Sequence, residues 1–395
     1  MVKENRKVEI EAFQKKITVE RVIGHIEGNQ SQPTVIAIAG IHGNEQAGIY
    51  ALHSVYESIK KQDIQFMGNF YALSGNLNAL KQNIRFEKLD LNRIWTQETI
   101  LNINKDTNGF DAEINEQIAL YHIIKDILSK NKGPFYFIDL HTTSSPTKPF
   151  ITISDSLNNR KFTSNFSVPI VLGIEEYLDG PLLTFVNEFG HVALGFEGGE
   201  HYAEQSIINC EAFIWLSLVI TKCINKDQIK NYDLYKHLLC EKRNTQDFYA
   251  IKFKYAIENN ETFAMNNGFK NFDTIDKHQL LALSNGKKIK ANIKGKIFMP
   301  LYQKQGDDGF FIINPISKFW LNLSKTVRKL KMYHLLRILP GIKMDAAHAH
   351  TLIVNPKTAR FMAIEIFHLF GYRKQVIKDN KFHFIKRDRK ISGFK

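Results

Sequence analysis

Cysteine is scarce in this chain of 395 residues, and long apolar stretches are missing. The three cysteines, Cys210, Cys223 and Cys240, are an odd number without the close spacing of metal-binding pairs, which is typical of a reducing compartment. The most apolar run, residues 212–220, is far shorter than a helix that crosses a bilayer. Residues 1–7 are charged rather than apolar, so the sequence does not indicate secretion. We therefore expect a cytoplasmic protein.

Acidic residues are scarce in one region only, the C-terminal fifth of the chain. Residues 317–395 contain 18 Lys and Arg against 4 Asp and Glu, whereas the other 316 residues contain 35 against 36. The net charge of +13 therefore comes from this region. Such asymmetry indicates a domain boundary near Pro315 and an anionic partner for the basic region.

Apolar runs alternate with helical periodicity over about residues 19–226, and the hydrophobic content of 44% is sufficient for a large core. Strands are expected at residues 35–39, 69–73 and 135–141, and helices at residues 46–61, 113–130 and 206–222. This alternation predicts an α/β sandwich with a mostly parallel sheet, in which sites form at the carboxyl ends of the strands. We assign residues 1–230 to this domain.

Two regions with different sequence patterns follow the first domain. Short strands separated by glycine turns are expected between residues 247 and 313, which predicts a small β domain over residues 240–316. Residues 317–395 form a basic extension, with one helical stretch to Leu339 and a second helix over about residues 356–370.

The helical stretch that opens the basic extension is amphipathic. Trp320, Leu323 and Val327 recur near helical spacing, and basic residues such as Lys325 and Arg328 are interleaved with them. We favour a helix packed on the protein with its basic face in solvent. A weak contact with an anionic membrane surface is the alternative. Nucleic-acid binding is supported by charge alone, because no recognition motif accompanies it.

A histidine and a glutamate lie three residues apart in the turn that follows the apolar run 34–39. An imidazole and a carboxylate at this spacing reach one metal ion, so His42 and Glu45 are candidate zinc ligands, although the spacing arises by chance about once in such a chain. A catalytic zinc needs a third protein ligand, and His141 is the best placed, because it ends a buried strand. Asp139 lies on the same face of that strand and is placed to orient a ligand.

Five short motifs follow one another over about residues 34–200. They are Gly40-Ile41-His42-Gly43-Asn44-Glu45, Gly75-Asn76-Leu77-Asn78-Ala79, Asp90-Leu91-Asn92-Arg93-Ile94-Trp95, Asp139-Leu140-His141-Thr142-Thr143 and Gly195-Phe196-Glu197. Because these motifs occur in this order, the sequence resembles the succinylglutamate desuccinylase and aspartoacylase family of zinc-dependent deacylases, which are related to the metallocarboxypeptidases. The resemblance implies a three-layer sandwich like that of the zinc carboxypeptidases, and one Zn²⁺ per chain.

The resemblance also implies roles for individual residues. The residues that hold the zinc ion would be His42, Glu45 and His141. Glu197 would be the general base that takes a proton from water and passes it to the leaving amine. Its neighbours Glu200 and His201 are rivals for this role, but a His201 ligand would fill the fourth position of the zinc and close it.

Three polar residues match the family positions that bind substrate. Asn92 and Arg93 would pair with a substrate carboxylate, and Arg85 would stabilise the developing oxyanion. Aspartoacylases carry a further arginine at a position that falls near Asn187 here, and the nearby segment 174–179 is acidic. An N-acyl-aspartate is therefore a poor candidate substrate, and we expect a different acylated amino acid or acyl amide.

The leading hypothesis is a zinc amidohydrolase that acts on a small-molecule acyl amide. A carboxypeptidase-like peptidase acting on short peptides is the enzymatic alternative, because the same histidine, glutamate and arginine pattern also serves peptide hydrolysis. From a different class, the alternative is a membrane- or nucleic-acid-associated binding module that retains a vestigial pocket.

Overall fold

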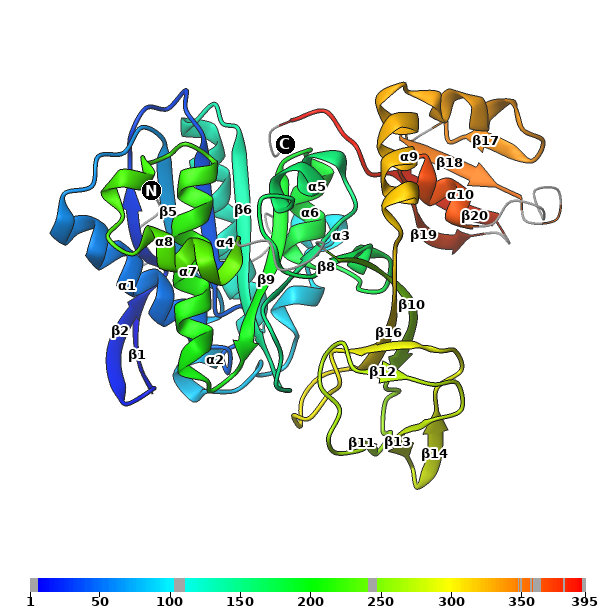
Figure 1. The fold of residues 1–395 in the computed structure, drawn as a ribbon, viewed down its shortest axis with the longest axis horizontal. Coiled ribbons are helices and arrows are strands. Elements are labelled where there is room, and N and C mark those ends of the chain that lie inside the picture. Colours follow the sequence, from blue (N-terminus) through cyan, green and yellow to red (C-terminus); the bar gives the residue numbers. More distant parts are fainter. Residues whose placement is uncertain are drawn as a thin grey trace.

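A mixed sheet of 11 strands extends through the first two parts of the chain (Figure 1). The computed structural model describes residues 6–102, 111–240, 247–346, 348, 350–355, 357, 364–378 and 381–392. The strand order is β12-β15-β16-β10-β8-β7-β9-β6-β4-β5-β3, and a separate hairpin of β1 (Lys7–Ala12) and β2 (Lys15–Glu20) precedes it. The sheet strands are β3 (Val22–Ile26), β4 (Thr34–Ala39), β5 (Asn69–Ser74), β6 (Phe135–Thr143), β7 (Phe150–Ile153), β8 (Ile170–Leu172), β9 (Val192–Glu200), β10 (Phe248–Ala256), β12 (Thr274–Ile275), β15 (Gly295–Phe298) and β16 (Asp308–Pro315).

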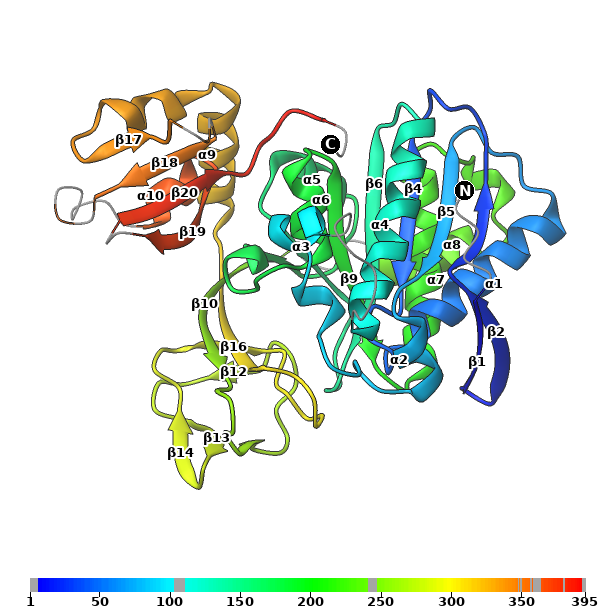
Figure 2. The same ribbon diagram turned by 180° about the vertical axis from the view of Figure 1, so that it is seen from behind.

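Helices cover both faces of the N-terminal part of this sheet. They are α1 (Ala47–Gln62), α2 (Leu77–Gln82), α3 (Gln97–Asn102), α4 (Ala112–Lys130), α5 (Leu157–Thr163), α6 (Leu182–Glu188), α7 (Glu204–Ile220) and α8 (Tyr232–Leu239), with short 3₁₀ turns η1 (Leu91–Arg93), η2 (Ile174–Glu176) and η3 (Lys226–Gln228). Figure 1 shows α7 and α8 in front of the sheet, and Figure 2 shows α4 on the opposite side. The first domain is therefore a three-layer sandwich.

Strand β4 illustrates how the sequence builds two cores at once. Successive side chains of a strand point to opposite faces of the sheet. Val35 and Ala37 accordingly pack in the cluster that contains α1 and α7, whereas Ile36 and Ile38 pack in the cluster that contains α4 and α6. Burial on both faces explains why the strand reads as a continuous apolar run.

The predicted fold class is confirmed. Strands β4, β5, β6 and β9 pair in parallel, whereas β3 and β7 pair antiparallel with β5 and β9, so the sheet is mixed but mostly parallel in this domain. The three helices expected from periodicity are α1, α4 and α7, and their ends lie within two residues of the prediction.

The small β region contributes strands to the same large sheet. Strand β10 pairs in parallel with β8 of the first domain and antiparallel with β16, so the sheet continues across the border expected near residue 240. A second sheet in this region is formed by β11 (Phe263–Met265), β13 (Leu280–Ser284) and β14 (Lys287–Lys290). A hydrophobic cluster around Leu281, Ile297 and Phe310 lies between them.

The basic extension folds into a separate C-terminal domain that contains a sheet as well as helices (Figure 1). Its elements are α9 (Lys318–Lys329), η4 (Met332–Ile338), β17 (Ile342–Met344), β18 (Thr351–Val354), α10 (Ile364–Leu369), β19 (Tyr372–Lys378) and β20 (Lys381–Lys386). The four strands form an antiparallel sheet in the order β17-β18-β20-β19, which the sequence analysis did not predict. The second predicted helix is present at its C-terminal end as α10, and most of its remainder lies outside the described residues.

Buried arginines hold the C-terminal domain against the first domain. Arg328 of α9 donates from Nη2 to the backbone carbonyl of Asp155 at 2.7 Å, and its Nη1 lies 3.4 Å from the Asp155 carboxylate. Arg387, which directly follows β20, donates from Nε to Glu175 at 2.9 Å. Burial raises the pKa of Asp155, but Arg160, Arg328 and Arg387 outweigh it and hold the pKa well below its usual range.

This interface corrects two expectations. Arg328 belongs to the helix whose basic face was expected in solvent, yet the residue is buried and only 5% exposed. The acidic segment 174–179 directs Glu175 and Glu176 to Arg387, so these carboxylates serve domain docking. Among the described residues, no helix combines the length and apolar character that a membrane span requires.

We predict that Arg387→Ala destabilises the docked C-terminal domain by about 3–5 kcal/mol, because the substitution leaves buried carboxylates without their cation. Urea denaturation and limited proteolysis of the full chain measure this effect. Arg337→Ala is the matched control, because Arg337 is exposed in η4. Equal stability of the two variants would contradict a docking role for Arg387.

Candidate metal centre

The turn after β4 places His42 and Glu45 on the carboxyl edge of the sheet. The strand ends at Ala39, and Gly40 adopts a positive φ of 68°, a conformation that glycine tolerates best. Gly43 passes so close to α2 that an added Cβ would lie 2.1 Å from the Ala79 carbonyl carbon. The turn closes with a hydrogen bond from the Glu45 amide to the His42 carbonyl at 3.1 Å, and α1 begins directly afterwards.

The Glu45 carboxylate lies between two imidazoles from different strands. Its Oε1 is 2.8 Å from His42 Nδ1, and its Oε2 is 2.8 Å from His141 Nδ1. The Thr142 amide also donates to Oε2 at 3.1 Å. All three side chains are buried, and one potential ligand atom from each lies within 4.8 Å of the others. The structure therefore brings together the three residues that the sequence analysis selected as ligands.

The charges of this cluster are strongly coupled. Burial raises the pKa of Glu45, but His42 and His141 outweigh it and hold the pKa well below its usual value. Burial lowers the pKa of His141, but Asp139 and Glu45 outweigh it and raise the pKa well above its usual value. A cation is therefore favoured at this position, whether it is a proton on a histidine or a metal ion.

Two further carboxylates contact the outer nitrogens of the histidines. Asp139 Oδ2 lies 2.8 Å from His141 Nε2, and Asp90 Oδ1 lies 3.1 Å from His42 Nε2. Such partners fix the tautomer and orientation of histidines that bind a metal through their other nitrogen. Two imidazole nitrogens and a carboxylate, each histidine backed by a second carboxylate, fit a Zn²⁺ ion. The role of Asp139 is the one predicted from the sequence, whereas the contact of Asp90 is new, although Asp90 opens one of the five motifs.

Glu197 lies beside the cluster on β9. Strands β6 and β9 run in parallel with His141 and Glu197 in register, so the two residues occupy neighbouring positions at the same sheet edge. Glu197 is 5% exposed, and no described residue hydrogen-bonds its Oε2. Burial raises the pKa of Glu197 to about 8. The group is therefore suited to accept and release a proton near neutral pH.

The two rivals of Glu197 occupy different environments. Glu200 is exposed at the end of β9. His201 is buried, and its Nδ1 and Nε2 lie within hydrogen-bond distance of Thr142 and Gln303. Both ring nitrogens of His201 are thus engaged away from the Glu45 carboxylate.

The three predicted substrate-binding residues line the same cavity. Arg85 Nη1 lies 3.3 Å from Glu45, and its Nη2 lies 3.2 Å from Asp90. Asn92 uses its side-chain oxygen to accept a hydrogen bond from the Leu182 amide at the start of α6. Arg93 donates to the Asp308 carboxylate at 2.7 Å, so this guanidinium is already paired with an anion.

The β region supplies a wall of the cavity that the sequence analysis did not identify. Asp307 and Asp308 border it from the start of β16, and Gln303 borders it from the preceding loop. The remaining lining combines apolar side chains, which are Ile153, Ile174, Leu178, Leu183, Met299, Leu301 and Phe311, with the hydroxyl side chains of Thr142, Thr143, Ser144, Thr152, Ser154 and Thr184. Asn187, near the missing arginine position, lies elsewhere and pairs with Asn159 at 2.9 Å.

Residues 31–208 match the family model of the succinylglutamate desuccinylase/aspartoacylase catalytic domain. A succinylglutamate desuccinylase of Photorhabdus laumondii is 29% identical over 150 residues, which cover 38% of this chain and 44% of that protein. One of Ectopseudomonas mendocina is 29% identical over 111 residues, covering 28% of this chain and 31% of that protein. The chain thus aligns with less than half the length of these relatives.

Solved structures are similar over a longer stretch. A succinylglutamate desuccinylase from Vibrio cholerae has a TM-score of 0.57 at 12% identity, covering 79% of this chain and 91% of that one. A succinylglutamate desuccinylase/aspartoacylase from Rhodobacter sphaeroides has a TM-score of 0.54 at 15% identity, covering 79% and 94%. These similarities show a shared fold.

We predict that Asp139→Asn lowers the affinity for Zn²⁺ by about 10–100-fold, because His141 loses the carboxylate that orients it. Competition titration of the purified protein with a chelator measures this affinity. Asp233→Asn is the control, because Asp233 is exposed on α8. An unchanged affinity in Asp139→Asn would show that the carboxylate has no part in metal binding.

Proposed function

The chain carries a catalytic domain of the succinylglutamate desuccinylase/aspartoacylase family, and on this premise we propose that it is a zinc-dependent hydrolase. The bond that it cleaves is the amide of a small N-acylated amino acid or a similar acyl amide. The buried group of His42, Glu45 and His141, with Glu197 in register beside it, carries the proposal. A hydrolase of this type needs a metal site and a nearby group that moves protons.

We assign the metal ligands to His42, Glu45 and His141. A bound Zn²⁺ would polarise the acyl carbonyl and lower the pKa of a water molecule from about 15.7 to near 7. Asp90 and Asp139 lie against the outer nitrogens of the two histidines and would hold the opposite nitrogens toward the ion.

Glu197 moves the proton in the proposed reaction. As the water oxygen bonds to the acyl carbon, the Glu197 carboxylate accepts the proton that the water gives up. When the carbon–nitrogen bond breaks, Glu197 returns this proton to the leaving amine, and the acyl group departs as a carboxylic acid, which releases its remaining proton to water at neutral pH. Arg85 borders the cavity, where it pairs with Glu45 and Asp90, and we assign it the role of donor to the oxyanion that forms between these steps.

The shape and charge of the cavity favour an acyl group with apolar character. Arg93 is the cation that a substrate carboxylate would use, but Asp308 occupies it and Asp307 adds a second negative charge nearby. Apolar side chains such as Leu178, Leu183 and Phe311 line the same cavity. A dicarboxylate would have to displace Asp308, whereas an apolar acyl chain meets no such cost.

We predict that Glu197→Gln retains about one zinc per chain but loses amide hydrolysis by about a hundredfold to ten-thousandfold, because the amide cannot accept the proton. His141→Ala is expected to lose the metal as well. Elemental analysis and turnover assays distinguish the two outcomes, and Glu200→Gln serves as the matched control. Unaltered turnover in Glu197→Gln would assign the base to another residue, and wild-type protein that is folded but takes up no zinc would overturn the metal assignment.

We further predict that an acyl amino acid with an apolar acyl chain is hydrolysed with a higher kcat/KM than its N-succinyl counterpart. Asp308→Asn should narrow this preference by about tenfold, because Arg93 becomes available to a substrate carboxylate. A substrate panel that also contains dipeptides measures it, with Asp276→Asn, an exposed site in the β region, as control. Faster hydrolysis of dipeptides than of every acyl amino acid would favour the peptidase alternative.

A further inference from the structure

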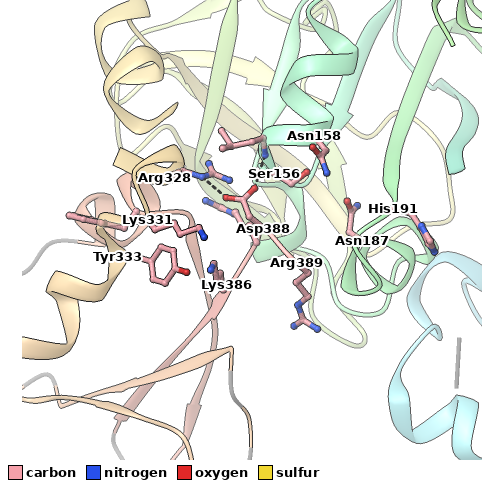
Figure 3. Close-up of a pocket in the computed structure, with 14 residues that line it drawn as sticks. Ser156, Asn158, Asn187, His191, Arg328, Lys331, Tyr333, Lys386, Asp388 and Arg389 are labelled. Carbon is pink, nitrogen blue, oxygen red and sulfur yellow. Dashed lines mark hydrogen bonds and ion pairs between the residues drawn. The ribbon is translucent and has the colours of Figure 1, made fainter. Parts of the chain in front are cut away.

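A second cavity, of about 240 Å³, lies between the C-terminal domain and the first domain (Figure 3). The C-terminal domain contributes Lys331, Tyr333, Lys386 and Arg389 to its wall. Asn187 and His191 line the opposite side, from the end of α6 and the loop before β9. This cavity is separate from the metal centre, whose lining shares none of these residues.

The polar ends of three side chains converge in this cavity. In Figure 3 the amino groups of Lys331 and Lys386 and the hydroxyl of Tyr333 point toward one another. Lys386 Nζ lies 3.5 Å from the centre of the Tyr333 ring. Within the described part of the chain, neither lysine forms a salt bridge with a carboxylate.

The one carboxylate among the lining residues is already engaged. Asp388 accepts hydrogen bonds from Arg328 Nε and from the Leu157 amide, each at 2.8 Å. Arg328 and Arg387 are themselves neutralised by the carboxylates of the domain interface. Among the described residues, Lys331 and Lys386 therefore have no carboxylate partner, whereas Arg389 lies near Glu188, to whose backbone carbonyl it donates at 3.3 Å.

His191 adds a neutral polar group at the border of the cavity. It is 3% exposed and packs against Phe135 and Phe137. The backbone of Ser392 lies close to the ring and partly offsets the effect of burial on its pKa. Burial lowers the pKa of His191 to about 4, so the ring is neutral at pH 7 and keeps one N–H to donate.

We propose that this cavity binds a phosphate group and that the occupant contacts both domains. Two ammonium groups and a phenol present donors to several oxygens of one anion, and lysine binds phosphate as a compact point charge. Like charges that converge without a counter-ion repel one another, and an anion between them removes this cost. The volume admits a phosphate with a small attached group, supplied by a soluble phosphorylated metabolite or by a phospholipid headgroup.

Calorimetric titration of the full chain with pyrophosphate at constant ionic strength tests the proposal, with sodium chloride as the blank. We expect Lys331→Gln and Lys386→Gln each to weaken binding by about tenfold or more, because each loses a charge-assisted hydrogen bond. Lys343→Gln is the matched control, because Lys343 is exposed on β17 outside the cavity. The lysine variants are needed because a metal centre also attracts phosphate.

Flotation with phosphatidylcholine vesicles, with and without phosphatidylinositol phosphate, distinguishes the two sources of the phosphate group. Pyrophosphate binding that needs Lys331 and Lys386 supports a soluble ligand, and vesicle binding that needs the same lysines supports a headgroup. The proposal is overturned if the wild-type chain binds neither probe. It is also overturned if the double variant Lys331→Gln/Lys386→Gln, folded as judged by its melting temperature, binds both probes as well as the wild type.

Discussion

The Glu45 carboxylate contacts both His42 and His141, and the candidate metal centre depends on these two contacts. A buried carboxylate is stable only where cations or hydrogen-bond donors surround it, and here two imidazoles and the Thr142 amide do so. These partners come from residues almost a hundred positions apart. They meet because β4 and β6 are parallel neighbours whose carboxyl ends coincide. The adjacent β9 adds Glu197 at the same edge, so one stretch of sheet supplies both the proposed metal ligands and the proposed proton carrier.

The β region completes this site instead of forming an independent module. Because β10 joins the edge of the main sheet at β8, the loop before β16 reaches over the metal centre. Asp308 from this region pairs with Arg93. In the proposed function this ion pair reduces the attraction of the cavity for a second carboxylate, so substrate selection depends on residues from two regions of the chain.

The basic residues of the C-terminal domain fall into two groups with different surroundings. Part of the surplus of positive charge in the C-terminal domain is neutralised within the protein, because Arg328, Arg373 and Arg387 pair with carboxylates of the first domain. Those pairs are buried or partly buried, so they act as a specific attachment between domains. Another part, around Lys331 and Lys386, borders a cavity whose one lining carboxylate among the described residues, Asp388, is engaged by Arg328. The arginines of this basic region thus attach the two domains, and its lysines at the cavity have the proposed binding function.

The sequence alone determined the elements with strong local signals. Continuous apolar runs predicted the buried strands, and 3.6-residue periodicity predicted α1, α4 and α7, because burial on a sheet or a helix face imposes its own period. The motifs also selected His42, Glu45 and His141, which the structure brings into one group. The sheet of the C-terminal domain escaped prediction, because its strands are short and rich in lysine, as in Lys381–Lys386.

Only the tertiary structure decided which residues meet. Asp90 reaches His42, and Asp308 reaches Arg93 across 215 positions of chain; neither contact leaves a pattern in the sequence. The acidic segment 174–179 suggested a charged substrate cavity, but its Glu175 and Glu176 point to Arg387 instead. The physical reason is common to all three cases. Local periodicity determines the face on which a side chain lies, whereas strand order and domain docking determine what that face meets.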